Sequence, residues 1–390
     1  MSQVLDQELT EKQLIEIRRH LHQIPELAMH EVQTHDYLLK IIKSFNQEFL
    51  EIREVEKLPT AILVYVKGSN PQLTVGYRTD IDALPVEEKT GLPFSSKHPG
   101  VMHACGHDIH MTVALGVLSY FAAHQPKDNM IFFFQPAEEN DNGGKVAYEL
   151  GVFKGKWLPD EFYGLHDNPQ LPAGAIGCRM GTLFAGTTEV NVDLIGKSGH
   201  AAYPQLANDM VVAASQFINQ IQTIVSRSVD PIEGGVITFG KMDAGTIRNV
   251  IAGRARIEGT IRGLTQKMIE HIVQRIKQVG QGIATSYGAK VNIEFNQGGY
   301  LPVENNPELT RHFIDFMKNQ PEVNFIETQP AMTGEDFGYL LSKIKGTMFW
   351  LGVEDKSQLH SATLNPKEES IELGVQAITK FLDYRMNDYK

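Results

Sequence analysis

The stretch QLTVGYRTD (residues 72–80) is a short apolar run that becomes polar at its end. It follows AILVYV (61–66) after the turn sequence KGSNP, so we expect two adjacent strands here. NMIFFFQ (129–135) and EFYGLH (161–166) are two further runs of strand length. Runs with apolar residues at helical spacing occupy 10–24, 36–45 and 110–124. Strands that alternate with helices predict an α/β domain with a mainly parallel sheet that helices cover on both faces.

The middle of the chain follows a different order. From TEVNVDLIG (188–196) to AKVNIEF (289–295), the patterns are those of a strand, a helix, two strands, a helix and a strand. This βαββαβ order is typical of a ferredoxin-like α+β domain with both helices on one sheet face. Helix and strand patterns of the first kind then resume. We therefore expect one α/β domain, residues 1–183 and 297–390, with an α+β domain, residues 184–296, inserted into it.

The composition excludes several classes of protein. The chain has 390 residues, enough for two hydrophobic cores, and no run is apolar enough to cross a bilayer. The net charge is −11 and Lys and Arg form no run, so we expect neither nucleic acid nor a membrane surface as a partner. The chain begins with polar residues rather than a secretory signal, and its two cysteines, Cys105 and Cys178, do not suggest a disulfide framework. These features predict a cytoplasmic protein.

Side chains capable of chemistry gather at the ends of the predicted strands, where open α/β sheets build their sites. The five places are Asp80 with Asp82; Cys105, His107 and Asp108; Glu138 with Glu139; His166; and His360. Each place by itself is more typical of a packed thiol, a solvated glutamate, a turn aspartate or an ordinary histidine. The coincidence of all five at strand ends favours a shared site.

A thiolate and an imidazole as close as Cys105 and His107 suit a borderline-soft cation such as zinc. Glu139 and the histidines are enough to fill two coordination spheres, so the residues allow two neighbouring metal ions. Adjacent glutamates are useful if one binds a metal ion and the other accepts the proton of a water molecule.

Several longer motifs resemble one known family. They are RRHLHQIPELAMHE, YRTDIDALP, MHACGHDIHMTVALG, FFFQPAEE, LHDNP, GKSGHAA, NVIAGRARIEGTIR, MTGEDFGYL and the late His360. In order and spacing they are similar to the hippuricase-type amidohydrolase branch of the two-zinc aminoacylase and carboxypeptidase family. The similarity runs over nearly the whole chain.

The resemblance implies a role for each candidate residue. The metal ligands would be Cys105, His107, Glu139, His166 and His360, and the ions would be zinc, with manganese, cobalt or nickel as alternatives. Glu138 would be the proton shuttle. An aspartate stands where other branches carry a metal-binding histidine, so Asp80 or Asp82 would orient a ligand or the acid, and which of them does so stays open. Asn140 follows the two glutamates where glycine is common, which leaves open which glutamate faces the metal.

The resemblance also gives the inserted domain a function. It implies a lid or dimerisation domain in a homodimer or higher oligomer. His200 would stabilise the oxyanion, and Asn249 and Arg262 would contact the carboxylate of the substrate.

The expected reaction is metal-dependent hydrolysis of an N-acyl amino acid. Within that branch, the resemblance carried by NDMVVAAS, IQTIVSR, MTGEDFGYLL and FWLGV implies N-acetyl-LL-2,6-diaminopimelate as the substrate, with acetate and LL-2,6-diaminopimelate as products, in the acetylated route of lysine biosynthesis. Other acyl amino acids, such as hippurate or indole-acetyl conjugates, and short peptides cleaved by an exopeptidase are alternatives. A metal-binding or regulatory protein without catalysis, and a structural module, are alternatives from other classes.

Overall fold

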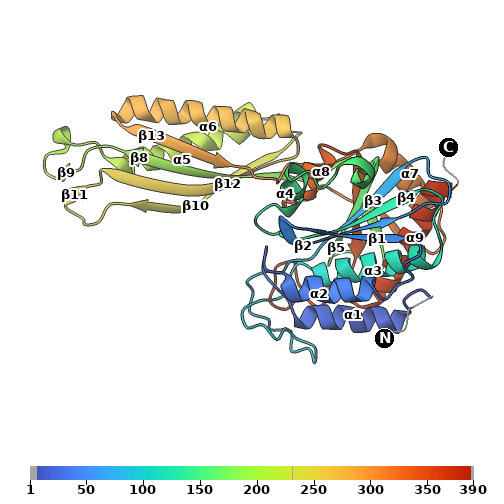
Figure 1. Cartoon of the computed structure of the whole chain (residues 1–390). Coiled ribbons are helices and arrows are strands. Elements are labelled where there is room, and N and C mark those ends of the chain that lie inside the picture. Colours follow the sequence, from blue (N-terminus) through green and yellow to red (C-terminus); the bar gives the residue numbers. More distant parts are fainter. Residues whose placement is uncertain (1–6, 231, 388–390) are drawn as a thin grey trace. The chain divides into compact units, whose positions relative to one another are not determined.

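The computed structural model describes residues 7–230 and 232–387 (Figure 1). The chain forms two compact units. Unit 1 comprises Met1–Leu183, Glu304–Gln329 and Tyr339–Lys390, and unit 2 comprises Phe184–Val303 and Pro330–Gly338. Unit 2 is therefore inserted into unit 1. None of the helices within the described residues combines the length and the apolar character that crossing a membrane requires.

Within the residues that the structure describes, unit 1 is built on an eight-stranded sheet. In spatial order its strands are β1 (Leu50–Val55), β2 (Leu58–Val66), β4 (Asn129–Gln135), β3 (Thr74–Asp80), β5 (Glu161–Asn168), β16 (Gly346–Gly352), β6 (Ile176–Cys178) and β15 (Phe325–Glu327). The four central strands, β4, β3, β5 and β16, are parallel to one another. They are buried almost without interruption, as parallel strands covered on both faces must be. The α/β architecture with a mainly parallel sheet is as predicted.

Helices cover this sheet. They are α1 (Glu11–Gln23), α2 (Val32–Ile42), α3 (His107–Ala123), α4 (Gly143–Glu149), α7 (Pro307–Lys318) and α9 (Glu369–Asn387), with a 3₁₀ turn at Gly155–Trp157. The short helix α8 (Phe337–Leu341) begins in unit 2 and ends in unit 1. Figure 1 shows α1, α2 and α3 on the same side of the sheet. Helix α3 is apolar nearly all round because α1 and α9 pack against it. Thr10 caps α1 through a reciprocal Thr10–Gln13 capping box.

Two features of the sheet differ from expectation. The strands at 61–66 and 72–80 are not neighbours, because β4 lies between β2 and β3. The short KGSNP turn suggested a hairpin, but β2 instead forms its hairpin with β1 (Leu50–Val55). No strand was predicted for LEIREV, since it stands at the sheet edge and carries alternating charged residues in place of an apolar run.

Unit 2 has the predicted βαββαβ order. Its elements are β8 (Gly186–Ile195), α5 (Met210–Ser228), β10 (Gly235–Ala244), β12 (Arg254–Gly263), α6 (Gln266–Tyr287) and β13 (Lys290–Asn296). The antiparallel sheet has the order β10-β12-β8-β13. Alternate residues of β8, such as Val190, Val192 and Leu194, are buried in one core with the apolar stripes of both helices. The two helices contact each other over this core.

The remaining elements of the chain are short. A two-stranded ribbon of β9 (Gly199–His200) and β11 (Val250–Ile251) lies in unit 2, with a 3₁₀ turn at Pro204–Leu206. Strands β7 (Gly181–Phe184) and β14 (Val303–Asn305) occur where the chain passes from one unit to the other.

Candidate metal centre

The candidate residues of unit 1 come together because the central strands are parallel neighbours. Asp80 ends β3, Glu138 and Glu139 follow β4, His166 lies near the end of β5, and His360 follows β16. These strands occupy consecutive places in the sheet and point the same way, so their carboxyl ends form one edge. The N-terminus of α3 brings Cys105 and His107 to the same edge.

Cys105 is the centre of the cluster. Its buried sulfur lies 3.5 Å from Nε2 of His166 and 3.3 Å from Nε2 of His360. Gly106, at φ 73°, turns the chain into α3, and a Cβ atom there would lie 2.3 Å from a carboxylate oxygen of Asp167. Only glycine therefore allows this turn to pass so close to Asp167.

His107 presents one ring nitrogen to the cluster. Nδ1 lies 2.9 Å from the backbone oxygen of Asp82, which favours the tautomer that leaves Nε2 as an acceptor. Nε2 lies 3.8 Å from Oε1 of Glu139, and both atoms are buried without a hydrogen-bond partner among the described residues. A buried imidazole nitrogen and a buried carboxylate oxygen that face each other unsatisfied would both be satisfied by a cation between them.

The donor atoms form overlapping groups in which every pair is within 4.8 Å. One group holds Cys105, His107 and His166, a second holds Cys105, Glu139 and His360, and a third holds His107, Glu138 and Glu139. A thiolate, imidazoles and carboxylates together suit zinc and similar divalent ions. The arrangement fits divalent metal, and Cys105 belongs to two of these groups.

Burial raises the pKa of the Cys105 thiol well above its usual range, and the carboxylates of Glu139 and Asp167 raise it further. Burial also raises the pKa of Glu139. Both groups therefore need a cation nearby to be stable in the ionised form that binds metal.

The two aspartates hold different partners. The carboxylate of Asp82 accepts the backbone N–H groups of Glu138 at 3.0 Å and Glu139 at 2.9 Å. Asp80 instead contacts Arg78 at 2.8 Å and Nδ1 of His110 at 2.6 Å. Burial alone would raise the pKa of Asp80, but His107, His110 and Arg78 hold it well below its usual range. Asp82 therefore binds the backbone of the glutamate pair, and Asp80 is an ionised partner of the surrounding cations.

Two buried residues of this edge were not selected from the sequence. Nε2 of His110 lies 3.1 Å from a carboxylate oxygen of Asp167, which also lies 3.1 Å from Nδ1 of His166. His110 stands three residues after His107 on α3, so helical spacing was the available signal. Asp167 stood directly after His166 but looked like an ordinary strand end.

Asp108 does not join the metal-ligand cluster. Its carboxylate binds Nε of Arg18 at 2.8 Å and Nδ1 of His22 at 2.9 Å, and all three side chains are buried. The RRHLH segment of α1 thus holds the first turn of α3, the turn that carries His107.

The site is open to solvent on one side. The side chain of His360 is 56% exposed, whereas Cys105, His107 and His166 are buried. A substrate therefore has access from the side of His360.

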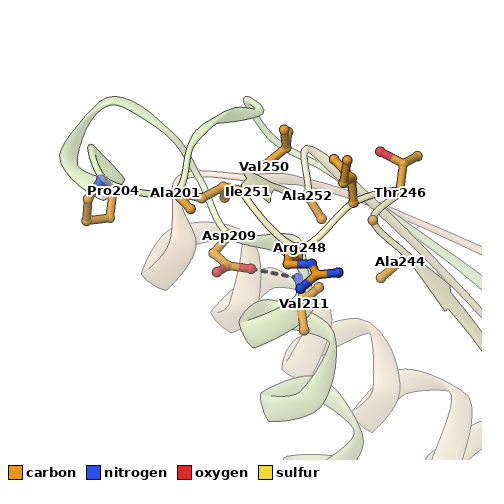
Figure 2. A pocket seen from close by; sticks show the side chains of 12 residues that line it. Ala201, Pro204, Asp209, Val211, Ala244, Thr246, Arg248, Val250, Ile251 and Ala252 are labelled. Atoms are coloured by element: carbon orange, nitrogen blue, oxygen red, sulfur yellow. Dashed lines mark hydrogen bonds between the residues drawn. The ribbon is translucent and has the colours of Figure 1, made fainter.

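The other candidate residues lie in unit 2. His200 of β9 is exposed and pairs with Val250 of β11, and Asn249 accepts the backbone N–H of Ala201 at 3.1 Å, so these two candidates lie close together. A pocket of about 620 Å³ is lined by their neighbours in the chain, among them Ala201 and Arg248 (Figure 2).

Arg262 is not brought together with His200. It is half-buried in β12, donates to the Thr187 hydroxyl at 2.5 Å and pairs with Thr187 at the start of β8. His200 instead follows the end of β8, where Ile195 pairs with Arg254. The two candidates belong to opposite ends of the sheet of unit 2.

Comparison with known proteins places the chain in a family. Residues 76–384 match peptidase family M20/M25/M40. A curated relative from Limosilactobacillus reuteri, N-acetyldiaminopimelate deacetylase, is 73% identical over 380 residues, which cover 97% of this chain and 100% of the relative.

Two solved structures are similar throughout. A putative aminohydrolase from methicillin-resistant Staphylococcus aureus has a TM-score of 0.89 and 33% identity, covering 97% of this chain and 96% of that one. A Bacillus subtilis protein described as a dinuclear metal-binding peptidase of the M20 family has a TM-score of 0.84 and 29% identity, covering 96% and 98%. The resemblance seen in the motifs and the prediction of a hydrolytic enzyme are thus confirmed: the chain belongs to peptidase family M20/M25/M40.

Proposed function

We propose that the protein hydrolyses N-acetyl-LL-2,6-diaminopimelate to acetate and LL-2,6-diaminopimelate, a step of the acetylated route of lysine biosynthesis. The observation that carries this proposal is the convergence of Cys105, His107, Glu139, His166 and His360 beside Glu138 at one sheet edge. The 73% identity to a full-length N-acetyldiaminopimelate deacetylase supports the choice of substrate. The free thiols of Cys105 and Cys178 support a location in the reducing cytoplasm.

The five converging residues would hold two divalent ions, zinc in the first instance and manganese, cobalt or nickel as alternatives. When bound, such ions supply Lewis-acid activation of water and of the acyl carbonyl. Glu139 is the ligand of the glutamate pair in this proposal, because its Oε1 lies 3.8 Å from Nε2 of His107 and 3.6 Å from Nε2 of His360.

Glu138 is then the general base. It takes a proton from the attacking water and gives it to the leaving amine as the amide bond breaks. Asp82 supports this role, because it holds the backbone N–H groups of both Glu138 and Glu139 and so fixes the directions in which the two side chains leave the loop. One glutamate can then bind metal while its neighbour handles the proton.

Residues 184–296 form the lid or dimerisation domain in this proposal. His200 stabilises the oxyanion, and Asn249 and Arg262 bind the substrate carboxylate. From Arg254 to Arg262, β12 extends roughly 25 Å, which exceeds the length of a small acyl amino acid. His200 and Arg262 of one copy therefore cannot contact the same substrate molecule within one unit 2, which supports a homodimer or higher oligomer that supplies them from two copies.

The test is acetate release from N-acetyl-LL-2,6-diaminopimelate by metal-loaded protein. Hippurate, indole-acetyl amino acids and short peptides are assayed in parallel, before and after treatment with a chelator and after metal is restored. We expect the acetylated diamino acid to have the highest kcat/KM and the chelator to abolish turnover reversibly. A higher kcat/KM for hippurate or for peptides would instead favour the broader amidohydrolase or the exopeptidase. Membership of a peptidase family argues against the two non-enzymatic alternatives.

A further inference from the structure

Glu31 is a buried carboxyl residue to which the chemistry above gives no role. It lies between α1 and α2 and is completely buried. Its Oε1 accepts two backbone N–H groups, that of Met29 at 3.0 Å and that of Ala137 at 2.9 Å. Ala137 directly precedes Glu138, so a residue more than 100 positions away contacts the loop of the glutamate pair.

Both residues that Glu31 holds have an unusual backbone. Ala137 has φ 58° and Met29 has φ 63°, in the left-handed region that residues other than glycine rarely adopt. Such a conformation persists only where the surroundings enforce it. At Ala137 one constraint is the bond to Glu31, and another is the bond from Gly143 N–H to the Ala137 carbonyl at 2.9 Å.

Two carboxyl groups together account for three consecutive N–H groups of this loop. Glu31 takes that of Ala137, and Asp82 takes those of Glu138 and Glu139. Asp82 fixes the N–H groups of the glutamates themselves, whereas Glu31 fixes the backbone turn just before them. If Ala137 relaxed to an ordinary φ, the direction of the Glu138 side chain would change with it.

We propose that Glu31 is a positioning residue for Glu138, acting through the left-handed turn at Ala137. The inference rests on the proposed function, in which Glu138 is the general base. Glu31 is not itself catalytic, because its buried carboxyl touches neither the donor atoms of the metal centre nor a surface that substrate reaches.

The location of this carboxyl is unfavourable for a charge. Burial and the nearby Asp82 raise the pKa of Glu31 to about 7. The hydrogen bonds that Oε1 accepts do not require a charge, since an amide oxygen accepts the same bonds. A substitution of Glu31 by glutamine therefore removes the charge and keeps the hydrogen-bond acceptor.

Three variants test the proposal. Glu31→Gln keeps an acceptor for Ala137 N–H and removes the charge, whereas Glu31→Met keeps the length of the side chain and removes the acceptor. Glu26→Ala is the matched control, because Glu26 lies in the same loop but accepts N–H and hydroxyl groups of Thr34 at 2.9 and 3.1 Å. The measurements are kcat and KM at saturating metal, bound metal per chain, and hydrogen exchange of the amides of residues 137–139.

We expect Glu31→Met to lower kcat by at least about tenfold, since a small misplacement of a catalytic group has such an effect. KM should stay within about twofold, and the amides of residues 137–139 should exchange faster. Glu31→Gln should restore kcat to within about threefold of wild type, and Glu26→Ala should leave both parameters and the exchange unchanged. If Glu31→Met does not fold, Glu31→Asp replaces it, because its shorter carboxylate cannot reach Ala137 from the same backbone position.

The proposal is overturned if Glu31→Met, or Glu31→Asp in its place, has wild-type kcat. It is also overturned if these variants lose activity only in proportion to lost metal, or if Glu31→Gln is as slow as Glu31→Met. Wild-type protein that hydrolyses none of the acyl substrates would instead contradict the proposed function, and the exchange rates would still show whether Glu31 holds the turn.

Discussion

The sulfur of Cys105 lies 3.3 Å from Nε2 of His360, although 255 residues separate them in the chain. The backbone joins the same two segments, because His360 donates its N–H to the carbonyl of Ala104 at 2.7 Å. His360 has φ 64°, so this contact is made by a turn that an ordinary residue seldom adopts. The late loop is thereby fixed to the turn that begins α3, and the metal centre depends on both ends of unit 1.

This contact predicts unequal effects on metal binding. Of the three donor groups named for the metal centre, two contain Cys105. One contains His360, together with Cys105 and Glu139. Cys105→Ala should therefore weaken binding of both ions, and His360→Ala should weaken mainly one, each by at least about tenfold. Bound metal per chain and competition with a chromogenic chelator measure the difference.

Cys178→Ala is the control for this experiment. Cys178 is also a buried free thiol, but its sulfur contacts backbone oxygens and Asn305 away from the donor groups. Its replacement should leave metal binding unchanged. Equal metal loss in all three variants would mean that the effect is one of folding rather than of ligation.

Substitutions of the two glutamates should have different effects, one on catalysis and one on metal binding. Glu138→Ala should lower kcat by at least about 10²-fold while the protein still binds two metal ions, because the proposed general base is removed and the proposed ligands remain. Glu139→Ala should lower metal binding itself, since Glu139 Oε1 faces two imidazoles. Metal analysis and initial rates on the same preparations distinguish the two. Retained turnover in Glu138→Ala would contradict its assigned role.

The candidate residues of this centre could be selected from the sequence more readily than the residues that support them. Cys105 and His107 stood out because a thiol and an imidazole lie two positions apart. His360 stood out because it follows a strand-like run, and parallel strands bring such ends together. Glu31 and Asp167 did not stand out. A carboxyl that accepts backbone N–H groups, as Glu31 does, or contacts imidazole nitrogens, as Asp167 does, looks in sequence like any surface acid. Local sequence patterns also do not give the spatial order of β2, β4 and β3, because strand pairing depends on contacts between distant segments.

The raised pKa of Glu31 predicts how stability depends on pH. Its ordinary value is 4.5, and in the folded protein it is about 7, so the folded state binds the proton more tightly than the unfolded state. Stability should therefore be greatest below pH 4.5, as far as Glu31 contributes, and should fall as the pH rises toward 7 and above. This change in pKa corresponds to about 3 kcal/mol.

Glu31→Gln carries no titrating group at this position, so its stability should not fall with rising pH in this way. The free energy of unfolding, measured in metal-free protein by denaturant titration from pH 4 to pH 8, should favour the variant over wild type increasingly with pH. Metal is removed because a bound cation would favour the carboxylate. A constant difference between the two proteins across this range would show that Glu31 does not change its protonation on folding.

The opposite positions of His200 and Arg262 in unit 2 predict complementation between subunits. If one substrate contacts His200 of one copy and Arg262 of another, His200→Ala and Arg262→Ala should each be nearly inactive alone. In a mixed dimer, one of the two sites would have both residues intact. Unfolding and refolding the two variants together in equal amounts should then restore about a quarter of wild-type activity, because half of the dimers are mixed and each has one complete site.

Refolding each variant separately before mixing is the control, and light scattering gives the oligomeric state. An active monomer, or mixed refolding that restores nothing, would mean that the two residues do not serve one substrate from two copies.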